Sequence, residues 1–183
     1  MSSEEDWIAE KKRIRGEMRR RLRLLSEDDK GAASERIVEK LAGLLPHGVL
    51  VGTFAGTKRE PDLRNLRDAR PDLRWCYPRC GAGGIMTFHE VETLKELKKG
   101  AFGLMEPRDR SVVVPPESFV TMLCPGVAFT VSGERLGHGG GFYDRYLADC
   151  PRAKKIGVCF KVQLQERIPS HPHDVGMDVV VAE

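Results

Sequence analysis

The sequence predicts an α/β domain with a largely parallel central sheet, because helical and strand-like segments alternate along the chain. Two segments near the N-terminus have the apolar spacing of amphipathic helices. Short apolar runs follow, separated by polar or Gly- and Pro-containing turns. No internal repeat, low-complexity tract or linker interrupts the 183 residues. We therefore expect one domain, 1–183, built around one core.

The two N-terminal helices are predicted from apolar residues that recur every three or four positions. The stripe of the first helix is Ile14, Met18, Leu22 and Leu25, and that of the second is Ala33, Ile37, Leu41 and Leu44. Ser26, with Asp29 three residues later, is typical of a capping residue at the start of the second helix. Pro46 and Gly48 are expected to end this helix.

Apolar runs and turn residues predict the order of the remaining elements. Strands are expected at 49–54, 74–78, 85–90, 119–124, 156–160 and 179–181, with 85–90 at a sheet edge. A short helix capped by Asp62 is expected through Arg70, weak helical character at 94–99, and a further helix at 143–147. Residues 100–116 are rich in glycine and proline, so we expect mainly a long connection there.

Composition and cysteine usage narrow the class of protein. The chain has 40% hydrophobic and 31% charged residues, and no apolar run approaches the roughly 20 residues of a membrane helix. The polar, acidic N-terminus does not resemble a targeting peptide. Five scattered cysteines suit a reducing compartment better than a disulfide framework or a zinc site. These features predict a cytoplasmic protein without a membrane partner.

Basic residues crowd the first predicted helix, although the net charge of the chain is only +3. The cluster comprises Lys11, Lys12, Arg13, Arg15, Arg19, Arg20, Arg21 and Arg23. Such a cluster can bind phosphate groups, but a solvated helix face explains it equally well. Binding to nucleic acid is a further alternative, which we do not expect because Trp7 is the only aromatic residue among the first fifty.

The most specific signal is the glycine-rich stretch 133–147, which reads GERLGHGGGFYDRYL. Its glycines allow a ligand to approach the backbone closely, and free N–H groups at the start of the following helix can bind anions. The stretch is neither a Walker A loop nor a GxGxxG motif. Glycines alone fit a ligand-free turn better. The flanking Arg135, Tyr143 and Asp144 favour a phosphate site.

Two aspartates are candidate magnesium ligands. Asp144 follows the glycines directly and would repel a bare phosphate unless Mg²⁺ lay between them. An acid in the first turn of a helix is an equally good interpretation. Asp174 is a possible second ligand, although a loop aspartate commonly caps a turn. The neighbouring His171 and His173 are expected to face solvent.

Together these residues resemble the 5-formyltetrahydrofolate cyclo-ligase family. The resemblance rests on Pro125-Gly126-x-x-Phe129, the glycine-rich stretch, Lys11-x-x-x-Arg15-Gly16, Glu60 and Asp174, and it extends over nearly the whole chain. It implies a three-layer fold similar to the sugar-phosphate isomerase and CoA transferase scaffold. It also implies that ATP phosphorylates the formyl oxygen of 5-formyltetrahydrofolate, which then cyclises to 5,10-methenyltetrahydrofolate with release of ADP and phosphate.

The resemblance further implies roles for the residues at matching positions, in a chain that we expect to be a monomer. The residues implied in catalysis are Arg135, Tyr143 and Asp144, and those implied in holding Mg²⁺ are Asp144 and Asp174. The ATP-binding residues are Lys11, Lys12, Arg13, Ile14, Arg15, Arg135, Leu136, Gly137, His138, Gly139, Gly140, Gly141, Phe142 and Tyr143. The substrate-binding residues are Arg15, Ala55, Glu60, His138, Gly139, Gly140, Gly141 and Phe142.

The sequence departs from the family pattern at two of these positions. Phe142 stands where the family often has tyrosine, and His138 occupies a variable position. Because Tyr143 remains, we expect activity to survive. The alternatives are a sugar-phosphate- or CoA-acting enzyme on a similar scaffold, and a relative that binds folate or nucleic acid without catalysis.

Overall fold

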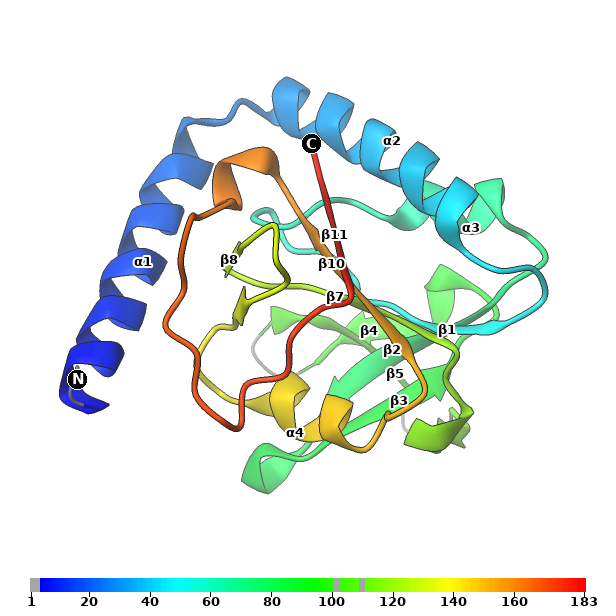
Figure 1. The fold of residues 1–183 in the computed structure, drawn as a ribbon. Coiled ribbons are helices and arrows are strands. Elements are labelled where there is room, and N and C mark those ends of the chain that lie inside the picture. Colours follow the sequence, from blue (N-terminus) through cyan, green and yellow to red (C-terminus); the bar gives the residue numbers. More distant parts are fainter. Residues whose placement is uncertain (1–3, 101–102, 109–110) are drawn as a thin grey trace.

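The structure is a computed structural model that describes residues 4–100, 103–108 and 111–183. Its centre is a seven-stranded sheet (Figure 1). The strands, in spatial order, are β11 (Val179–Ala182), β10 (Lys154–Cys159), β7 (Thr121–Cys124), β1 (Leu50–Gly52), β2 (Arg74–Cys80), β3 (Met86–Glu90) and β6 (Val113–Val114). The first five run parallel, and β3 and β6 are antiparallel to their neighbours. The predicted α/β class is confirmed.

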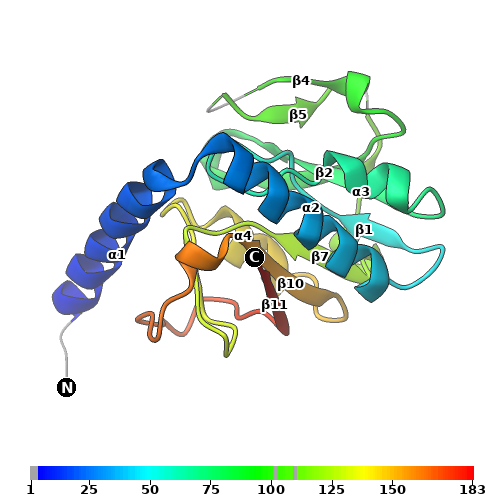
Figure 2. The same ribbon diagram turned by 90° about the horizontal axis from the view of Figure 1, so that it is seen from above.

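Helices cover both faces of this sheet. Helices α2 (Glu27–Leu44) and α3 (Arg64–Ala69) lie over one face, and α4 (Phe142–Ala148) lies over the other (Figures 1 and 2). Successive strand residues point to opposite faces. Trp75 and Tyr77 therefore join the core beneath α2, whereas Cys76 joins the core beneath α4 with Tyr146 and Leu147. This alternation gives the three-layer architecture.

Helix α1 (Glu4–Leu24) lies at one side of these layers, and its first turns extend away from them (Figure 2). The buried side chains of Ile14 and Met18 pack against Val127, Leu136 and further apolar residues after β7. This packing confirms the predicted apolar stripe. It also places Arg15 and Arg19 of α1 near the residues that follow the carboxyl end of β7, the usual place for ligand sites in open α/β sheets.

The second predicted helix is confirmed at its start and corrected at its end. The Ser26 hydroxyl accepts a hydrogen bond from the Asp29 backbone N–H at 3.0 Å, as a capping residue should. Leu44, expected in the core, is 39% exposed. Leu45 is buried in its place because the chain leaves the helix there and turns into extended backbone.

Several short elements also differ from expectation. Strand β3 is not an edge strand, since β6 pairs with its outer side. The weak helix at 94–99 is a 3₁₀ turn, Leu94–Glu96, followed by β4 (Leu97–Lys99). Strand β4 pairs with β5 (Met105–Pro107), so the expected connection 100–116 contains β5 and β6. Residues 101–102 and 109–110 of that connection lie outside the described residues.

The remaining elements are short. The N-cap of α3 is Leu63 rather than Asp62, although Asp62 Oδ1 still accepts the Arg64 backbone N–H at 3.0 Å. Strands β8 (Ala128–Phe129) and β9 (Arg135–Leu136) form a hairpin, and 3₁₀ turns occur at Ala82–Gly84, Pro116–Ser118 and Lys161–Gln163. In the described part of the chain, no helix combines the length and apolar character needed to cross a bilayer.

Candidate active site

Within the glycine-rich stretch, residues 137–141 form a sharp loop between β9 and α4. Gly139 and Gly141 have positive φ values of 106° and 65°, a conformation that costs other residues strain. Gly141 is the N-cap residue of α4, and 138–140 are exposed. The two glycines therefore allow the chain to leave the hairpin, expose its backbone and enter a helix within five residues.

Arg135 and Asp144 form an ion pair behind this loop. Arg135 Nη2 donates to Asp144 Oδ1 at 2.6 Å, and the Arg135 side chain is only 2% exposed. Its guanidinium also lies 5.5 Å from the centre of the Tyr143 ring. Arg135 thus faces the protein interior and lines neither of the two cavities described below. In this structure its contact is with Asp144 rather than with an open phosphate site.

Helix α1 reaches the loop through two basic residues. Arg15 Nε donates to the Gly137 carbonyl at 2.9 Å, and Lys11 Nζ lies 2.6 Å from Asp174 Oδ2. The Asp174 carboxylate also accepts the His171 backbone N–H at 2.7 Å. The structure therefore brings α1 together with two segments that lie more than 100 residues later in the chain.

The environment of Asp174 favours its charged form. Burial alone would raise the pKa of this carboxyl, but the hydrogen bonds from Lys11 and from the His171 N–H, with the positive charge of Lys11, outweigh burial. The pKa of Asp174 consequently lies below its ordinary value. An ionised carboxylate is the form that binds a cation.

Asp144 and the segment that carries Asp174 are in contact. Asp144 Oδ1 lies 3.3 Å from the backbone nitrogen of Val175, which follows Asp174 directly. Each carboxylate holds one cationic side chain, Arg135 or Lys11. Among the described residues no group of three or more His, Cys, Asp or Glu converges as a metal cluster. Two carboxylates nevertheless fit Mg²⁺, which usually takes one or two together with phosphate oxygens and water.

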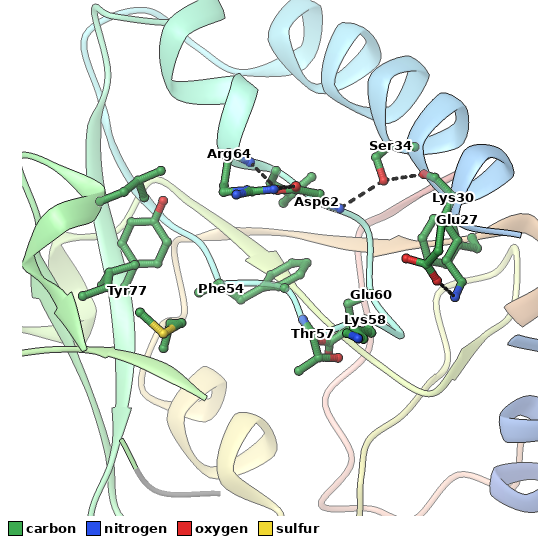
Figure 3. Close-up of a pocket in the computed structure, with 18 residues that line it drawn as sticks. Glu27, Lys30, Ser34, Phe54, Thr57, Lys58, Glu60, Asp62, Arg64 and Tyr77 are labelled. Atoms are coloured by element: carbon green, nitrogen blue, oxygen red, sulfur yellow. Dashed lines mark hydrogen bonds and ion pairs between the residues drawn. The ribbon is translucent and has the colours of Figure 1, made fainter. Parts of the chain in front are cut away.

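A large cavity of about 640 Å³ opens at the carboxyl end of β1 (Figure 3). This volume falls in the range of small-molecule sites. Figure 3 shows Phe54 between Tyr77 of β2 and Glu60 of the loop after β1, and Ala55 also lines the cavity. Leu94, Leu97 and Met105 line it too, so the β4–β5 hairpin that the sequence did not predict forms part of the wall.

Glu60 supplies the cavity with a buried carboxylate. Its side chain is 9% exposed, its Oε2 accepts the Thr57 backbone N–H at 2.9 Å, and its Oε1 lies 3.6 Å from His138 Nε2. Burial alone would raise the pKa of Glu60, but the His138 ring and the Thr57 donors outweigh it and lower the pKa. Glu60 is therefore an acceptor-only group that faces a half-apolar cavity.

A small cavity of about 40 Å³ is also lined by Glu60. Arg15, Arg19, Arg59 and His138 contribute its remaining polar side chains together with Gln163. Glu60 is the residue that the linings of the two cavities share. Arg59, Arg19 and Tyr77 were not predicted as site residues. For Arg59, the one sequence signal was its position next to Glu60.

Tyr143 carries an unsatisfied hydroxyl in the described structure. The residue is half-buried, but its Oη is buried and makes no hydrogen bond. Burial raises the pKa of Tyr143 well above its ordinary value, so the hydroxyl keeps its proton and remains a donor. A buried donor without a partner costs about 1–3 kcal/mol, which a ligand acceptor would offset.

Other predicted site residues lie elsewhere. Lys12 is exposed, Arg13 pairs with Glu10 and Glu17 on the surface of α1, and Ile14 is in the core. The structure does not bring these three side chains to the cavities. Leu136 is also buried, and Phe142 packs against the core beneath α4. Among residues 137–141, His138 lines the small cavity, and the four glycines line neither of the two cavities.

Comparison with known proteins identifies relatives of this chain. A protein from Saccharomyces cerevisiae named 5-formyltetrahydrofolate cyclo-ligase is 33% identical over 107 residues, which cover 52% of this chain and 50% of that protein. The enzyme of the same name from Mus musculus is 24% identical over 189 residues, covering 94% of this chain and 93% of the relative. This chain therefore matches about half the length of the yeast relative and nearly all of the mouse relative.

A solved structure and a family model extend the likeness to almost the whole chain. The solution structure of 5,10-methenyltetrahydrofolate synthetase from Aquifex aeolicus superposes with a TM-score of 0.81 and 31% identity, covering 94% of this chain and 89% of that one. The sequence model of the 5-formyltetrahydrofolate cyclo-ligase family matches residues 7–183. The chain belongs to the 5-formyltetrahydrofolate cyclo-ligase family.

Proposed function

We propose that this chain catalyses the ATP-dependent cyclisation of 5-formyltetrahydrofolate to 5,10-methenyltetrahydrofolate, with release of ADP and phosphate. The observation that carries the proposal is that Glu60 lines both cavities. One cavity has the size and apolar lining for a pterin, and the other contains Arg15 and His138, which match the nucleotide-binding positions of the family. The two substrates would therefore meet beside Glu60.

The chemistry needs an activated formyl oxygen. The γ-phosphoryl group moves from ATP to that oxygen, which breaks its bond to ADP. The neighbouring nitrogen then attacks the formyl carbon and loses its proton, and the C–O bond breaks with departure of phosphate. Positioning and charge stabilisation provide most of the catalysis in phosphoryl transfer.

The folate is held by the large cavity in this proposal. The Glu60 carboxylate accepts hydrogen bonds from the pterin amino groups, and Ala55, Phe54 and Tyr77 pack against the ring. The lowered pKa of Glu60 keeps it ionised for this role. His138 lies beside Glu60 and would border the formyl group with Gly139 and the glycines after it.

The nucleotide is held between α1 and the glycine-rich loop. Lys11 and Arg15 bind its phosphates, and the backbone of 137–141 approaches them closely. Tyr143 donates its hydroxyl hydrogen to substrate or phosphate, which satisfies its buried oxygen. Arg135 holds Asp144 in place.

Asp144 and Asp174 would hold Mg²⁺, which neutralises charge on the ATP phosphates when it is bound. Both carboxylates now pair with cations, so Arg135 and Lys11 would give up part of those contacts. Lys11 would then be free to turn from Asp174 toward the nucleotide. We also propose that the protein is a cytoplasmic monomer; its five free cysteines suit a reducing compartment.

The test is formation of the methenyl product from 5-formyltetrahydrofolate, Mg²⁺ and ATP, followed by its absorbance. Product should accumulate in proportion to enzyme and to ATP, and its yield should match the ADP released. Absence of product at high concentration of folded protein would refute the proposed function. Light scattering at several protein concentrations tests the monomer.

A further inference from the structure

Three arginines converge on the small cavity. Arg15 and Arg19 lie one turn apart on α1, and Arg59 comes from the loop after β1. With Glu60, the lining carries three positive charges and one negative, a net charge of +2 when His138 is neutral. Like charges at i and i+4 destabilise a helix, and a third charge adds to the repulsion. An anion between them would reverse this penalty.

The contacts of these arginines differ from those of an ordinary charged helix face. Arg13 and Arg21 on α1 pair with Glu17 in the usual way. The Arg19 and Arg59 side chains, by contrast, have no ion pair or hydrogen bond within the described structure. Burial lowers the pKa of Arg15 and the charge of Arg19 lowers it further, and these two effects outweigh the opposing charge of Asp174. The Arg19 and Arg59 guanidiniums thus lack an ion-pair partner within the described structure, and Arg15 and Arg19 repel each other.

The Arg15 guanidinium also has N–H donors that make no hydrogen bond within the described structure. Its Nε donates to the Gly137 carbonyl, which orients the guanidinium. A Cβ placed on Gly139 would lie 3.8 Å from Arg15 Nη2, so the Arg15 guanidinium lies against the glycine-rich loop. The Nη atoms make no hydrogen bond in the described structure. They are therefore available to a ligand.

The rest of the small cavity is a rigid, satisfied wall. Gln163 Nε2 donates to the Gly126 and Val127 carbonyls at 2.9 and 3.1 Å, and its Oε1 accepts the Phe160 N–H at 2.9 Å. Glu60 Oε2 is satisfied by Thr57. About 40 Å³ holds a tetrahedral oxyanion but neither a base nor a pterin.

We propose that Arg19 and Arg59 join Arg15 in binding the phosphoryl group as it passes from ATP to the formyl oxygen and leaves as phosphate. This proposal rests on the proposed function. Guanidinium forks bind phosphate through paired charge-assisted hydrogen bonds, and a net charge of +2 matches dianionic phosphate. The P–O bond to ADP breaks, the bond to the formyl oxygen forms, and the later C–O cleavage frees phosphate within reach of the same three arginines.

The experiment uses inorganic phosphate as the probe and the full chain without ATP or folate. Calorimetry measures its Kd for wild type, Arg19→Gln, Arg59→Gln and Arg20→Gln. Arg20 is the matched control because it is exposed on α1 and does not line the cavity. Loss of a charged hydrogen bond should weaken phosphate binding about tenfold to a hundredfold in the first two variants. The control should stay within about twofold.

Steady-state kinetics gives a second readout. The inhibition constant of phosphate and the KM for ATP should rise in Arg19→Gln and Arg59→Gln, and the KM for 5-formyltetrahydrofolate should change little. Arg59→Lys should lie between wild type and Arg59→Gln, since it keeps the charge but loses the fork. Thermal melting of every variant confirms folding, and Arg59→Lys serves if Arg59→Gln does not fold.

The outcomes separate this proposal from the proposed function. Wild type that does not bind phosphate, or variants that bind it unchanged, would overturn the phosphate site. Equal weakening in Arg20→Gln would also overturn it, because general attraction by the basic helix would then explain binding. Arginine-dependent phosphate binding without methenyl product would support the site and overturn the proposed function. Normal turnover in Arg19→Gln and Arg59→Gln, with the KM for ATP and the inhibition constant of phosphate unchanged, would support the proposed function and overturn the phosphate site.

Discussion

Lys11 Nζ lies 2.6 Å from Asp174 Oδ2, a contact between helix α1 and the loop before β11 that spans 163 positions of the chain. In the proposed function one of these residues binds phosphate and the other binds Mg²⁺. Their pairing means that each satisfies the other's charge before the nucleotide and the metal bind. Formation of the site then requires an exchange of partners rather than the exposure of bare charges.

Replacing Asp174 with asparagine should raise the Mg²⁺ concentration needed for half-maximal turnover by about tenfold or more. Stability should fall by less than about 1 kcal/mol, because the pair is partly exposed, with side chains 18% and 26% accessible. Turnover at varied Mg²⁺ and urea unfolding provide the measurements. Asp68→Asn, at an exposed position of α3, is the control. An unchanged Mg²⁺ requirement would remove Asp174 from the metal site.

Replacing Asp144 with asparagine should reduce both stability and turnover. The Arg135 guanidinium would be left buried without its counter-charge, which costs about 3 kcal/mol. Turnover should fall by about a hundredfold as well, through loss of a metal ligand. Unfolding curves and initial rates measure the two effects separately.

The double variant Arg135→Met, Asp144→Asn distinguishes these two roles of Asp144. Removing both charges should restore stability to within about 1 kcal/mol of wild type, because no unpaired buried charge remains. Turnover should stay low. If turnover recovered with stability, neutralising Arg135 would be the whole function of Asp144.

The pH dependence of stability should include a contribution from Glu60. Its pKa is lowered in the folded protein, so the unfolded chain takes up its proton first as pH falls. The resulting stabilisation is fully present above the ordinary pKa of 4.5 and disappears as pH falls through the lower folded value. The stability difference between wild type and Glu60→Gln should therefore shrink below about pH 4.5. Chemical unfolding of both proteins at pH values from about 3 to 7 measures this stability difference on either side of the ordinary pKa. A difference that stayed constant over this range would contradict the proposed contribution of Glu60.

Replacing Gly141 with alanine should strain the loop that leads into α4. A residue with a side chain at φ 65° costs about 1–2 kcal/mol, and the new Cβ would lie 2.6 Å from Arg145 Nη1. We expect lower stability and a higher KM for ATP. Gly43→Ala is the matched control: it lies within α2, has open space around it, lines neither cavity and should stabilise the protein by about 0.4–1 kcal/mol. Similar effects of the two variants on KM would argue against a role for the loop conformation.

The sequence by itself determined the features that depend on neighbours along the chain. The spacing of Ile14 and Met18 predicted the buried face of α1, and Ser26 predicted the start of α2, because helix periodicity and capping are local. The order of arginine, glycines, tyrosine and aspartate in 135–144 indicated the family, since such a motif is read directly from residue types.

The tertiary structure decided which of these residues meet. The pairing of β4 with β5, the burial of Leu45 instead of Leu44, and the inward direction of Arg135 all depend on contacts between distant segments. The same holds for the convergence of Arg15, Arg19 and Arg59 around one cavity. The spacing of charges along the sequence did not distinguish Arg19 from Arg20 as a candidate phosphate-binding residue. Packing of α1 against the segments after β7 places Arg19 in the lining of the small cavity and Arg20 outside it, because a side chain's direction follows from how its helix packs.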